Sequence, residues 1–210
     1  MSGKFISLEG GEGAGKSTLL AGLCAHLEAR GIDALFTREP GGTPLGEGVR
    51  ELVLGAPRGS VCAESELLLM FASRAQLVRE ILRPALAAGR VVVCDRFADA
   101  SHAYQGGGRG QPEARIAALE AWAVDGLKPD LTLLLDLPVQ AGHERIAGRG
   151  APDRIESEAL PFFERVRAAY RARAAAEPAR FCVIDASQPV EQVLADAVAA
   201  VDRLLQGETA

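Results

Sequence analysis

A phosphate-binding loop near the start of the chain constrains the fold more than any other feature. Residues 10–17 read Gly-Gly-Glu-Gly-Ala-Gly-Lys-Ser, and they follow the apolar segment 5–8 and precede a helical pattern of leucines. In such a strand–loop–helix unit, glycines let backbone N–H groups curl around phosphate oxygens at the positive end of a helix. We expect Lys16 to reach the outer phosphates and Ser17 to offer its hydroxyl to Mg²⁺. The loop therefore predicts a triphosphate ligand.

Short apolar runs alternate with longer helical patterns along the rest of the chain. The runs lie at 5–8, 33–37, 91–94, 131–135 and 181–184, and the helical patterns near 16–30, 64–88, 112–125, 139–148, 156–176 and 189–206. This alternation is typical of an α/β fold with a mostly parallel sheet. The central runs lack the period-two alternation of half-exposed strands, which indicates helices on both faces. We predict a three-layer nucleotide-binding fold with a five-stranded parallel sheet, in one domain over residues 1–210.

Composition narrows the classes of partner. The net charge of −5 and the few aromatic residues argue against a nucleic-acid binder. The start of the chain lacks a secretory signal, and no segment is apolar enough to cross a bilayer, so we expect a cytoplasmic protein without a membrane partner. Four cysteines lie far apart without paired spacing, which predicts neither a zinc site nor disulfides but reduced, mostly buried thiols.

Polar residues follow the predicted strands. They are the phosphate-binding loop itself, Arg38 and Glu39, Asp95 and Arg96, Asp136, and Asp185. In open α/β sheets, ligands bind outside the carboxyl ends of the strands, so these residues are predicted to gather at one edge. Asp95 can hold the magnesium shell there, while Arg96 can meet phosphate oxygens. A surface ion pair is the alternative for this common dipeptide.

Three further patterns suggest binding residues. Arg74 lies on the inward stripe of the pattern at 64–88, beside Phe71, and therefore needs either a protein carboxylate or an anionic ligand. Arg145 and Arg149 precede a turn-rich stretch that ends at Arg154, which indicates an arginine-bearing lid near residues 142–155; a solvated helix face is the alternative. The glycine-rich segment 101–110 reads as a flexible loop that walls an acceptor site, or as a surface hairpin.

Taken together, these motifs resemble those of bacterial thymidylate kinases over nearly the whole chain. The resemblance is carried by the segments 37–43 (Thr-Arg-Glu-Pro-Gly-Gly-Thr), 95–97 (Asp-Arg-Phe) and 103–110 (Ala-Tyr-Gln-Gly-Gly-Gly-Arg-Gly), together with the phosphate-binding loop and the lid arginines. It implies a homodimeric kinase that transfers the γ-phosphoryl group of ATP to thymidine 5′-monophosphate (dTMP), with Mg²⁺ as cofactor.

The same resemblance implies roles for individual residues. The ATP site would comprise Gly10, Gly11, Glu12, Gly13, Ala14, Gly15, Lys16, Ser17, Thr18, Gln188, Pro189 and Val190. The dTMP site would comprise Glu12 at the sugar 3′-hydroxyl, Arg38 and Arg96 at the phosphate, Tyr104 against a ribose 2′-hydroxyl, and Glu39, Phe71, Arg74, Ser101 and Gln105 around the remainder. Catalysis would rest on Lys16, Asp95, Arg96, Arg145, Arg149 and Arg154, and the metal on Ser17 and Asp95.

One position departs from the family pattern. Many relatives carry their stacking aromatic residue four positions before the arginine that matches Arg74, and here that position is Met70, with Phe71 one residue later. Either side chain can pack on the base.

The phosphate-binding loop alone also fits a kinase for another nucleotide or nucleoside, or a GTP-driven switch. The chain has no asparagine and no Asp-x-x-Gly element, which argues against the switch.

Overall fold

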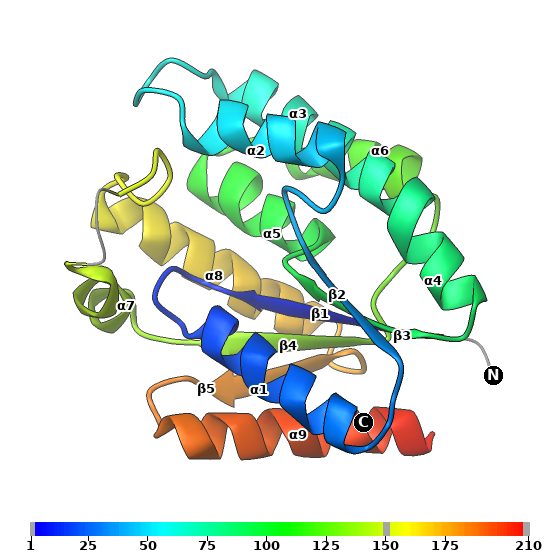
Figure 1. The fold of residues 1–210 in the computed structure, drawn as a ribbon. Helices are drawn as coiled ribbons and strands as arrows, with labels where there is room; N and C mark the ends of the chain where they lie inside the picture. The colour runs from blue at the N-terminus through cyan, green and yellow to red at the C-terminus, as the bar shows by residue number, and fades with distance from the viewer. Residues whose placement is uncertain (1–2, 149–151, 208–210) are drawn as a thin grey trace.

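Five parallel strands form the centre of the protein. A computed structural model describes residues 3–148 and 152–207. The strands are β1 (Lys4–Gly10), β2 (Ala34–Arg38), β3 (Val91–Asp95), β4 (Leu131–Asp136) and β5 (Phe181–Asp185). They pair in the order β2-β3-β1-β4-β5, and every pairing is parallel. The predicted α/β fold with a five-stranded parallel sheet is confirmed, and β1, which leads into the phosphate-binding loop, occupies its centre (Figure 1).

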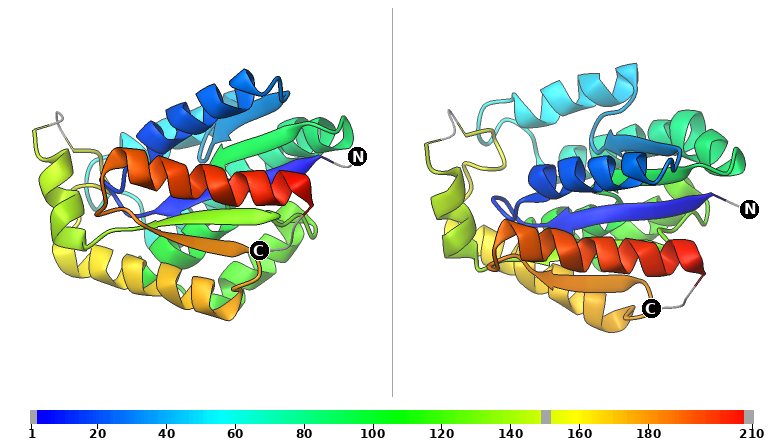
Figure 2. Two further views of the ribbon diagram at one scale, coloured as in Figure 1. Left: turned by 90° about the horizontal axis from the view of Figure 1, so that it is seen from below. Right: turned by 60° about the horizontal axis from the view of Figure 1, so that its bottom comes forward.

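Helices connect the strands and cover both faces of the sheet (Figures 1 and 2). The helices are α1 (Lys16–Ala29), α2 (Pro44–Leu54), α3 (Ala63–Leu77), α4 (Arg83–Ala87), α5 (Ala98–Ser101), α6 (Glu113–Val124), α7 (Val139–Ile146), α8 (Leu160–Ala176) and α9 (Val190–Gln206), with π-helical segments η1 (Val78–Leu82) and η2 (His102–Gly108). Leucines of α1 and small residues of α9 pack with Ile6 and Leu8 on one face. No described helix is long and apolar enough to span a membrane.

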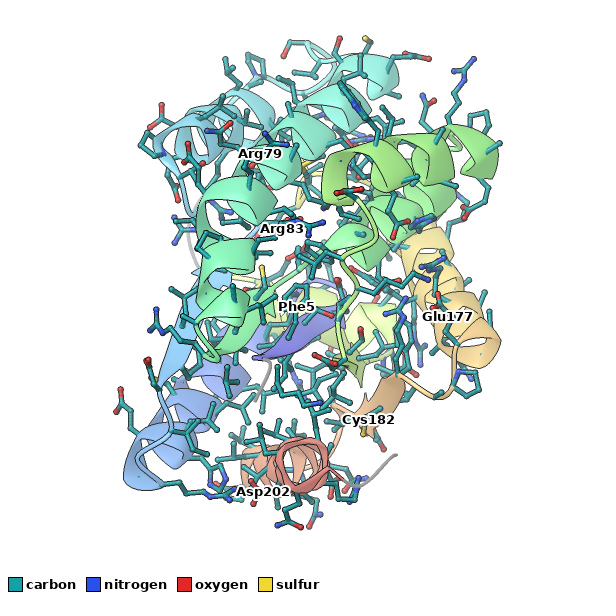
Figure 3. The ribbon with its side chains drawn as sticks, turned by 90° about the vertical axis from the view of Figure 1, so that its right-hand side faces the viewer. Phe5, Arg79, Arg83, Glu177, Cys182 and Asp202 are labelled. Carbon is teal, nitrogen blue, oxygen red and sulfur yellow. The ribbon has the colours of Figure 1, made fainter. Side chains whose placement is uncertain are left out.

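The opposite face of the sheet is covered by the helical run from α3 to α4 and by α8. Phe5 of β1 is 1% exposed and packs among residues of α3, η1 and β3, and its ring meets that of Phe97 edge-on at 4.9 Å. Figure 3 shows Phe5 in the interior, between the sheet and this helical run. Because successive strand residues alternate between faces, β1 supplies Phe5 to one layer and Ile6 to the other. The central strands β1, β3 and β4 are therefore buried on both faces, as their apolar runs predict, whereas the edge strands β2 and β5 are partly exposed.

The glycine-rich segment 101–110 differs from its prediction as a flexible loop or hairpin. Most of it belongs to the buried helical run of α5 and η2. A Cβ on Gly107 would lie 2.8 Å from the carbonyl oxygen of Arg165, and one on Gly108 would lie 2.4 Å from the Phe162 ring. These glycines allow η2 to approach α8 closely, so they serve packing and not flexibility.

Other local predictions also need correction. The predicted helix at 64–88 is a continuous run of α3, η1 and α4, with a π-helical stretch before Pro84, which has no N–H to donate. Helix α2 was not predicted, although Thr43 caps it by accepting from the Gly46 N–H and a proline follows the cap. The thiols are not mostly buried, since Cys94 is buried but Cys62 is exposed.

Candidate active site

The phosphate-binding loop joins the end of β1 to the start of α1. Gly13 and Gly15 have φ angles of 71° and 96°, in the region that favours glycine. A Cβ on Gly13 would lie 2.2 Å from the carbonyl oxygen of Gly142, so this position accepts no larger residue without movement. Lys16 Nζ donates to the carbonyl oxygens of Gly10 and Gly11 over 3.1 and 3.0 Å. The loop therefore holds its lysine at the N-terminus of α1.

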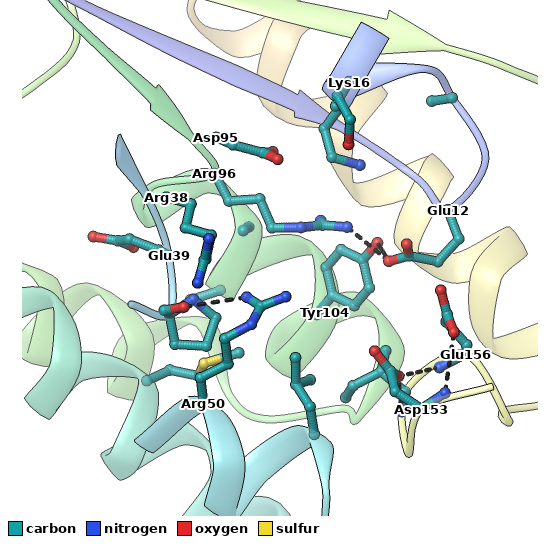
Figure 4. Close-up of a pocket in the computed structure, with 18 of the residues that line it drawn as sticks. Glu12, Lys16, Arg38, Glu39, Arg50, Asp95, Arg96, Tyr104, Asp153 and Glu156 are labelled. Carbon is teal, nitrogen blue, oxygen red and sulfur yellow. Dashed lines mark hydrogen bonds and ion pairs between the residues drawn. The ribbon is translucent and has the colours of Figure 1, made fainter. Parts of the chain in front are cut away.

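A cavity of about 290 Å³ lies at the carboxyl ends of β1, β2 and β3 (Figure 4). It brings together residues that are far apart in the sequence. From the predicted site, its lining includes Glu12, Gly13, Ala14, Gly15, Lys16, Ser17, Thr18, Arg38, Glu39, Arg74, Asp95, Arg96, Ser101, Tyr104 and Gln105. The predicted gathering of polar residues is observed for the segments that follow β1, β2 and β3, whereas Asp136 and Asp185, at the ends of β4 and β5, do not line this cavity.

Arg96 connects the loop to the cavity wall. Its backbone has a φ of 71°, a strained value for a residue other than glycine, and it directly follows β3. Its guanidinium donates to Glu12 Oε1 over 2.7 Å and lies 4.5 Å from the centre of the Tyr104 ring. Burial favours the neutral acid, but the charges of Arg96 and Lys16 hold the pKa of Glu12 below its ordinary value. Glu12 is therefore an anion that orients the arginine.

Arg74 is 2% exposed and has a protein carboxylate as its partner, one of the two alternatives that its position on the helix left open. It donates to Glu39 Oε2 over 2.7 Å and to Ser101 Oγ over 2.9 Å, while it also lines the cavity. Burial, opposed by the charge of Arg74, raises the pKa of Glu39 to about 7. The second oxygen of this carboxyl, Oε1, is buried without a hydrogen-bond partner among the described residues. Arg74 is thus a fixed cation at the cavity wall.

The structure corrects the assignment of Phe71 to the cavity. Phe71 is 3% exposed and packs with Leu67 and Ile116 between α3 and α6, and it does not belong to the lining. Its ring carries the Arg74 guanidinium 4.6 Å from its centre. Met70 lines the cavity instead. On a helix, positions three and four residues before Arg74 lie on either side of it, so the two side chains point to different neighbours.

The lid arginines occupy different places. Arg145 is exposed on α7 and donates to the Ala186 carbonyl oxygen over 3.0 Å. Arg154 is 5% exposed and donates to Glu66 Oε2 and to the Val53 carbonyl oxygen, each over 2.6 Å. Neither lines the cavity. Their predicted role at the phosphates stays a prediction. Arg149 lies outside the described residues.

The predicted adenine stretch lies apart from the cavity. Gln188, Pro189 and Val190 are exposed after β5. Gln188 Nε2 donates to Asp185 Oδ2 over 3.1 Å, which shapes the turn into α9. Since Arg145 binds Ala186, two residues earlier, α7 and this turn are neighbours. The stretch is therefore placed beside α7, on the β5 side of the loop.

Asp95 and Ser17 lie at the edge where a metal is predicted. Asp95 Oδ1 is buried and has no hydrogen-bond partner within the described part of the chain. Ser17 is exposed in the first turn of α1 and lines the same cavity. No group of three or more histidine, cysteine, aspartate or glutamate side chains converges as a metal site among residues 3–148 and 152–207. A metal bound here would thus take only a few ligands from the protein, as Mg²⁺ at phosphates does.

Some residues of the site were not predicted. Arg50 of α2 lines the cavity and donates to the Pro40 carbonyl oxygen over 3.2 Å. Recognition of the Thr43 cap would have revealed α2 and placed Arg50 on it. Asp153 and Glu156 also line the cavity, and Glu66 lies buried behind it. The hydrogen bonds of Asp153 and Glu156 are local, since Asp153 Oδ1 accepts from the Glu156 N–H. No local pattern marks Glu66, because its partners come from distant segments.

Comparison with known proteins gives one consistent result. A family model described as thymidylate kinase matches residues 8–197. A protein named thymidylate kinase from Pseudomonas savastanoi pv. phaseolicola is 55% identical over 98% of this chain and 96% of its own length. One from Pseudomonas putida is 55% identical over 99% and 97%, and one from Chromohalobacter salexigens is 57% identical over 94% of each chain.

Proposed function

The chain belongs to the thymidylate kinase family, and from this premise we propose how its residues divide the work of phosphoryl transfer. The enzyme transfers the γ-phosphoryl group of ATP to dTMP with Mg²⁺ as cofactor and releases ADP and thymidine 5′-diphosphate (dTDP), a step of nucleotide biosynthesis. The observation that carries the assignment of residues is one cavity that is lined both by the phosphate-binding loop and by Arg38, Arg74, Ser101, Tyr104 and Gln105. Donor and acceptor can meet there.

We assign the donor phosphates to residues 10–18. Support comes from the glycine backbone at Gly13 and Gly15 and from Lys16, which the loop holds at its mouth. Exchange of the carbonyl contacts of Lys16 for phosphate oxygens would place its charge on the outer phosphates. Residues 188–190 would lie along the adenine, because they follow β5 on the same edge of the sheet.

Mg²⁺ fits Ser17 and Asp95. The unpartnered, buried Asp95 Oδ1 supports this assignment, since carboxylate and hydroxyl oxygens are the protein ligands that Mg²⁺ prefers. When bound, the ion neutralises charge on the phosphates of ATP. In this assignment Asp95 helps to position the Mg²⁺ ion and does not act as a general base toward the acceptor.

The acceptor phosphate needs cations and no strong base. A phosphate monoester is largely dianionic at pH 7, because its second pKa is about 6. One of its oxygens attacks the γ-phosphorus, and the bond from that phosphorus to the bridging oxygen of ADP breaks. Arg38 and Arg96 line the cavity and would hold the acceptor in line against the repulsion between the two anions.

The remaining acceptor contacts are assigned from the cavity wall. Glu12 would receive the sugar 3′-hydroxyl, and the Tyr104 ring beside it would exclude a ribose 2′-hydroxyl. Arg74, Ser101 and Gln105 would meet the edge of the base, with Met70 in place of Phe71 against its face. The thioether of Met70 can pack on an aromatic ring. Glu39 acts through Arg74, to which it is hydrogen-bonded.

Arg149 is the lid arginine that we assign to the transferring phosphoryl group. Support comes from its neighbours: Arg145 and Arg154 are held by Ala186 and Glu66. An arginine in this role contributes about 10³ to 10⁵ in rate. We propose that the segment 142–155 closes over bound nucleotides and excludes water, so that ATP is not hydrolysed.

We also propose that the enzyme is a cytoplasmic homodimer. Two large apolar residues are exposed on the adjoining helices α3 and α6, Leu68 at 57% and Trp122 at 84%. A second copy that packs against this face would cover them. The cysteines are free, which suits a reducing compartment. Sedimentation of the wild type and of Trp122→Lys tests the dimer, since the variant is expected to sediment as a monomer.

The activity is tested by ADP formation with purified protein. ATP and Mg²⁺ are offered with dTMP, dUMP, dCMP, dGMP, UMP or thymidine, and the product is identified. A strong preference for dTMP with dTDP as product supports the proposed base contacts. Preference for another acceptor would overturn these contacts, and ATP hydrolysis without any acceptor would overturn the proposed lid.

A further inference from the structure

Glu66 is a buried carboxylate behind the base side of the cavity. It lies on α3 with no exposed surface. Its Oε1 accepts from Gln105 Nε2 over 2.8 Å, and its Oε2 accepts from the Arg154 guanidinium over 2.6 Å. Arg109 Nε also donates to both oxygens, over 3.4 Å to Oε1 and 3.2 Å to Oε2. Donors from η2, from the turn after it and from the segment before α8 thus meet on one side chain.

The charge of Glu66 is compensated by these neighbours. Arg154 and Arg109 supply two positive charges, and Glu158, which is ion-paired with Arg109, supplies a second negative charge. Charge-assisted hydrogen bonds of this kind offset the cost of burying a carboxylate, whereas removal of one partner would leave that cost unpaid. All of these described contacts of Glu66 are with donors, namely the Gln105 amide and the two guanidinium groups, so its oxygens act as hydrogen-bond acceptors.

An acceptor-only neighbour fixes the orientation of the Gln105 amide. The oxygen and nitrogen ends of a glutamine side chain are distinguished by their hydrogen-bond partners. Because a carboxylate oxygen can only accept, the amide nitrogen of Gln105 must face Glu66 Oε1. Gln105 also lines the cavity, and no hydrogen bond to its side-chain oxygen, Oε1, is found within residues 3–148 and 152–207. The carbonyl oxygen is thus left for a ligand that carries a donor.

We infer that Glu66 is a positioning residue that makes the site select a pyrimidine with a donor at N3. Thymine carries an N3–H, which the Gln105 carbonyl oxygen can accept, whereas cytosine presents a bare N3 that would face this oxygen without a proton between them. Glu66 thereby sets the discrimination between dTMP and dCMP without contact to either nucleotide. This inference rests on the proposed function, in which Gln105 meets the base.

Glu66→Gln tests the inference, because it changes the chemistry of the contact with little change in shape. Arg154 and Arg109 can only donate hydrogen bonds, so the side-chain oxygen introduced by Glu66→Gln is expected to face them. Its NH₂ group then faces Gln105, whose amide must rotate to accept it. The rotated Gln105 presents its own NH₂ to the cavity, where it can donate to cytosine N3. The preference for dTMP should therefore shift toward dCMP.

The experiment measures kcat/KM for dTMP and dCMP in the wild type and in Glu66→Gln. We expect the dTMP to dCMP ratio to fall at least about tenfold in the variant, which corresponds to the exchange of one hydrogen bond. An unchanged ratio in the variant would overturn the inference and leave the proposed function intact. A wild type that does not phosphorylate dTMP would overturn the proposed function as well.

Two further variants separate positioning from general loosening. Glu158→Gln weakens the ion pair with Arg109 but leaves the contact between Glu66 and Gln105, so its ratio should match the wild type. In Gln105→Ala the acceptor is removed, so the ratio should fall, and addition of Glu66→Gln should lower it no further. If Glu66→Gln does not fold, an unchanged ratio in Gln105→Ala would by itself overturn the inference.

Discussion

The phenolic hydroxyl of Tyr104 donates a hydrogen bond of 2.7 Å to Glu12 Oε1. Burial raises the pKa of Tyr104 well above its ordinary value, so this hydroxyl remains a donor throughout the working pH range. Arg96 donates to the same oxygen. The wall of the proposed acceptor site and the phosphate-binding loop are therefore joined through one carboxylate, and Tyr104 has a polar role beside the steric role proposed for its ring.

Tyr104→Phe and Tyr104→Ala should separate these two roles. Tyr104→Phe keeps the ring but removes one of the two donors to Glu12 Oε1, so we expect KM for dTMP to rise about three- to tenfold, as for the loss of one hydrogen bond. Discrimination between dTMP and ribothymidine 5′-monophosphate should stay as in the wild type. Tyr104→Ala also opens the space for a 2′-hydroxyl and should reduce this discrimination. Equal discrimination in both variants would place the gate elsewhere.

Lys16→Ala should strongly lower turnover and leave the fold intact. The side chain bonds only to the carbonyl oxygens of its own loop among the described contacts. We expect kcat to fall about 100-fold or more, as for loss of a positioned cation in a transition state. The melting temperature should change little, and Lys4→Ala, at the far end of β1, serves as the control. Activity that survives in Lys16→Ala would remove the loop from the proposed chemistry.

Met70→Ala should mainly weaken dTMP binding, whereas Phe71→Ala should mainly lower the stability of the fold. Met70 lines the cavity, so its truncation should raise KM for dTMP several-fold with little change in the free energy of unfolding. Phe71 is buried between α3 and α6, and its truncation should lower the free energy of unfolding by about 3–5 kcal/mol. Urea unfolding and steady-state kinetics check both. If Phe71→Ala raised KM for dTMP more than Met70→Ala does, Phe71 and not Met70 would be the residue that packs on the base.

These two neighbours illustrate what the sequence can predict. The phosphate-binding loop is readable because its chemistry is local: each glycine, Lys16 and Ser17 acts within one strand–loop–helix unit. The choice between Met70 and Phe71 requires the rotation of α3 against α6, which a single sequence leaves open. The Arg154–Glu66 pair joins positions separated by 88 residues, so no spacing reveals it. The glycines of η2 read as flexible because the close approach of α8 is a tertiary contact.

Glu9 should make stability depend on pH. This carboxyl is fully buried, accepts from the Phe97 N–H and the Tyr170 hydroxyl, and has its pKa raised to about 8 by burial and by the charge of Asp99. Between its ordinary pKa of 4.5 and about 8, the folded state binds a proton that the unfolded state has lost. Its contribution to stability is therefore complete below pH 4.5 and is lost as the pH rises through about 8.

Urea unfolding of the wild type and Glu9→Gln from pH 5 to 9 checks this dependence. The glutamine stays neutral, so the stability of the variant should fall less steeply over this range than that of the wild type. The free energy of unfolding of the variant minus that of the wild type should therefore be more positive at pH 9 than at pH 5. Parallel curves would show that Glu9 keeps an ordinary pKa in the folded protein.

Arg149→Ala and Arg154→Ala should distinguish a lid arginine that acts on phosphate from one that holds the lid segment. Arg154 is buried against Glu66 and the end of α2, so its removal leaves a buried carboxylate short of a partner and should cost about 3–5 kcal/mol of stability. Arg149→Ala should lower kcat about 10³-fold or more, with smaller changes in KM for ATP and in melting temperature. If instead Arg154→Ala lost turnover at unchanged stability, Arg154 would have to leave Glu66 during catalysis. Arg154, and not Arg149, would then be the arginine that contacts the transferring phosphoryl group.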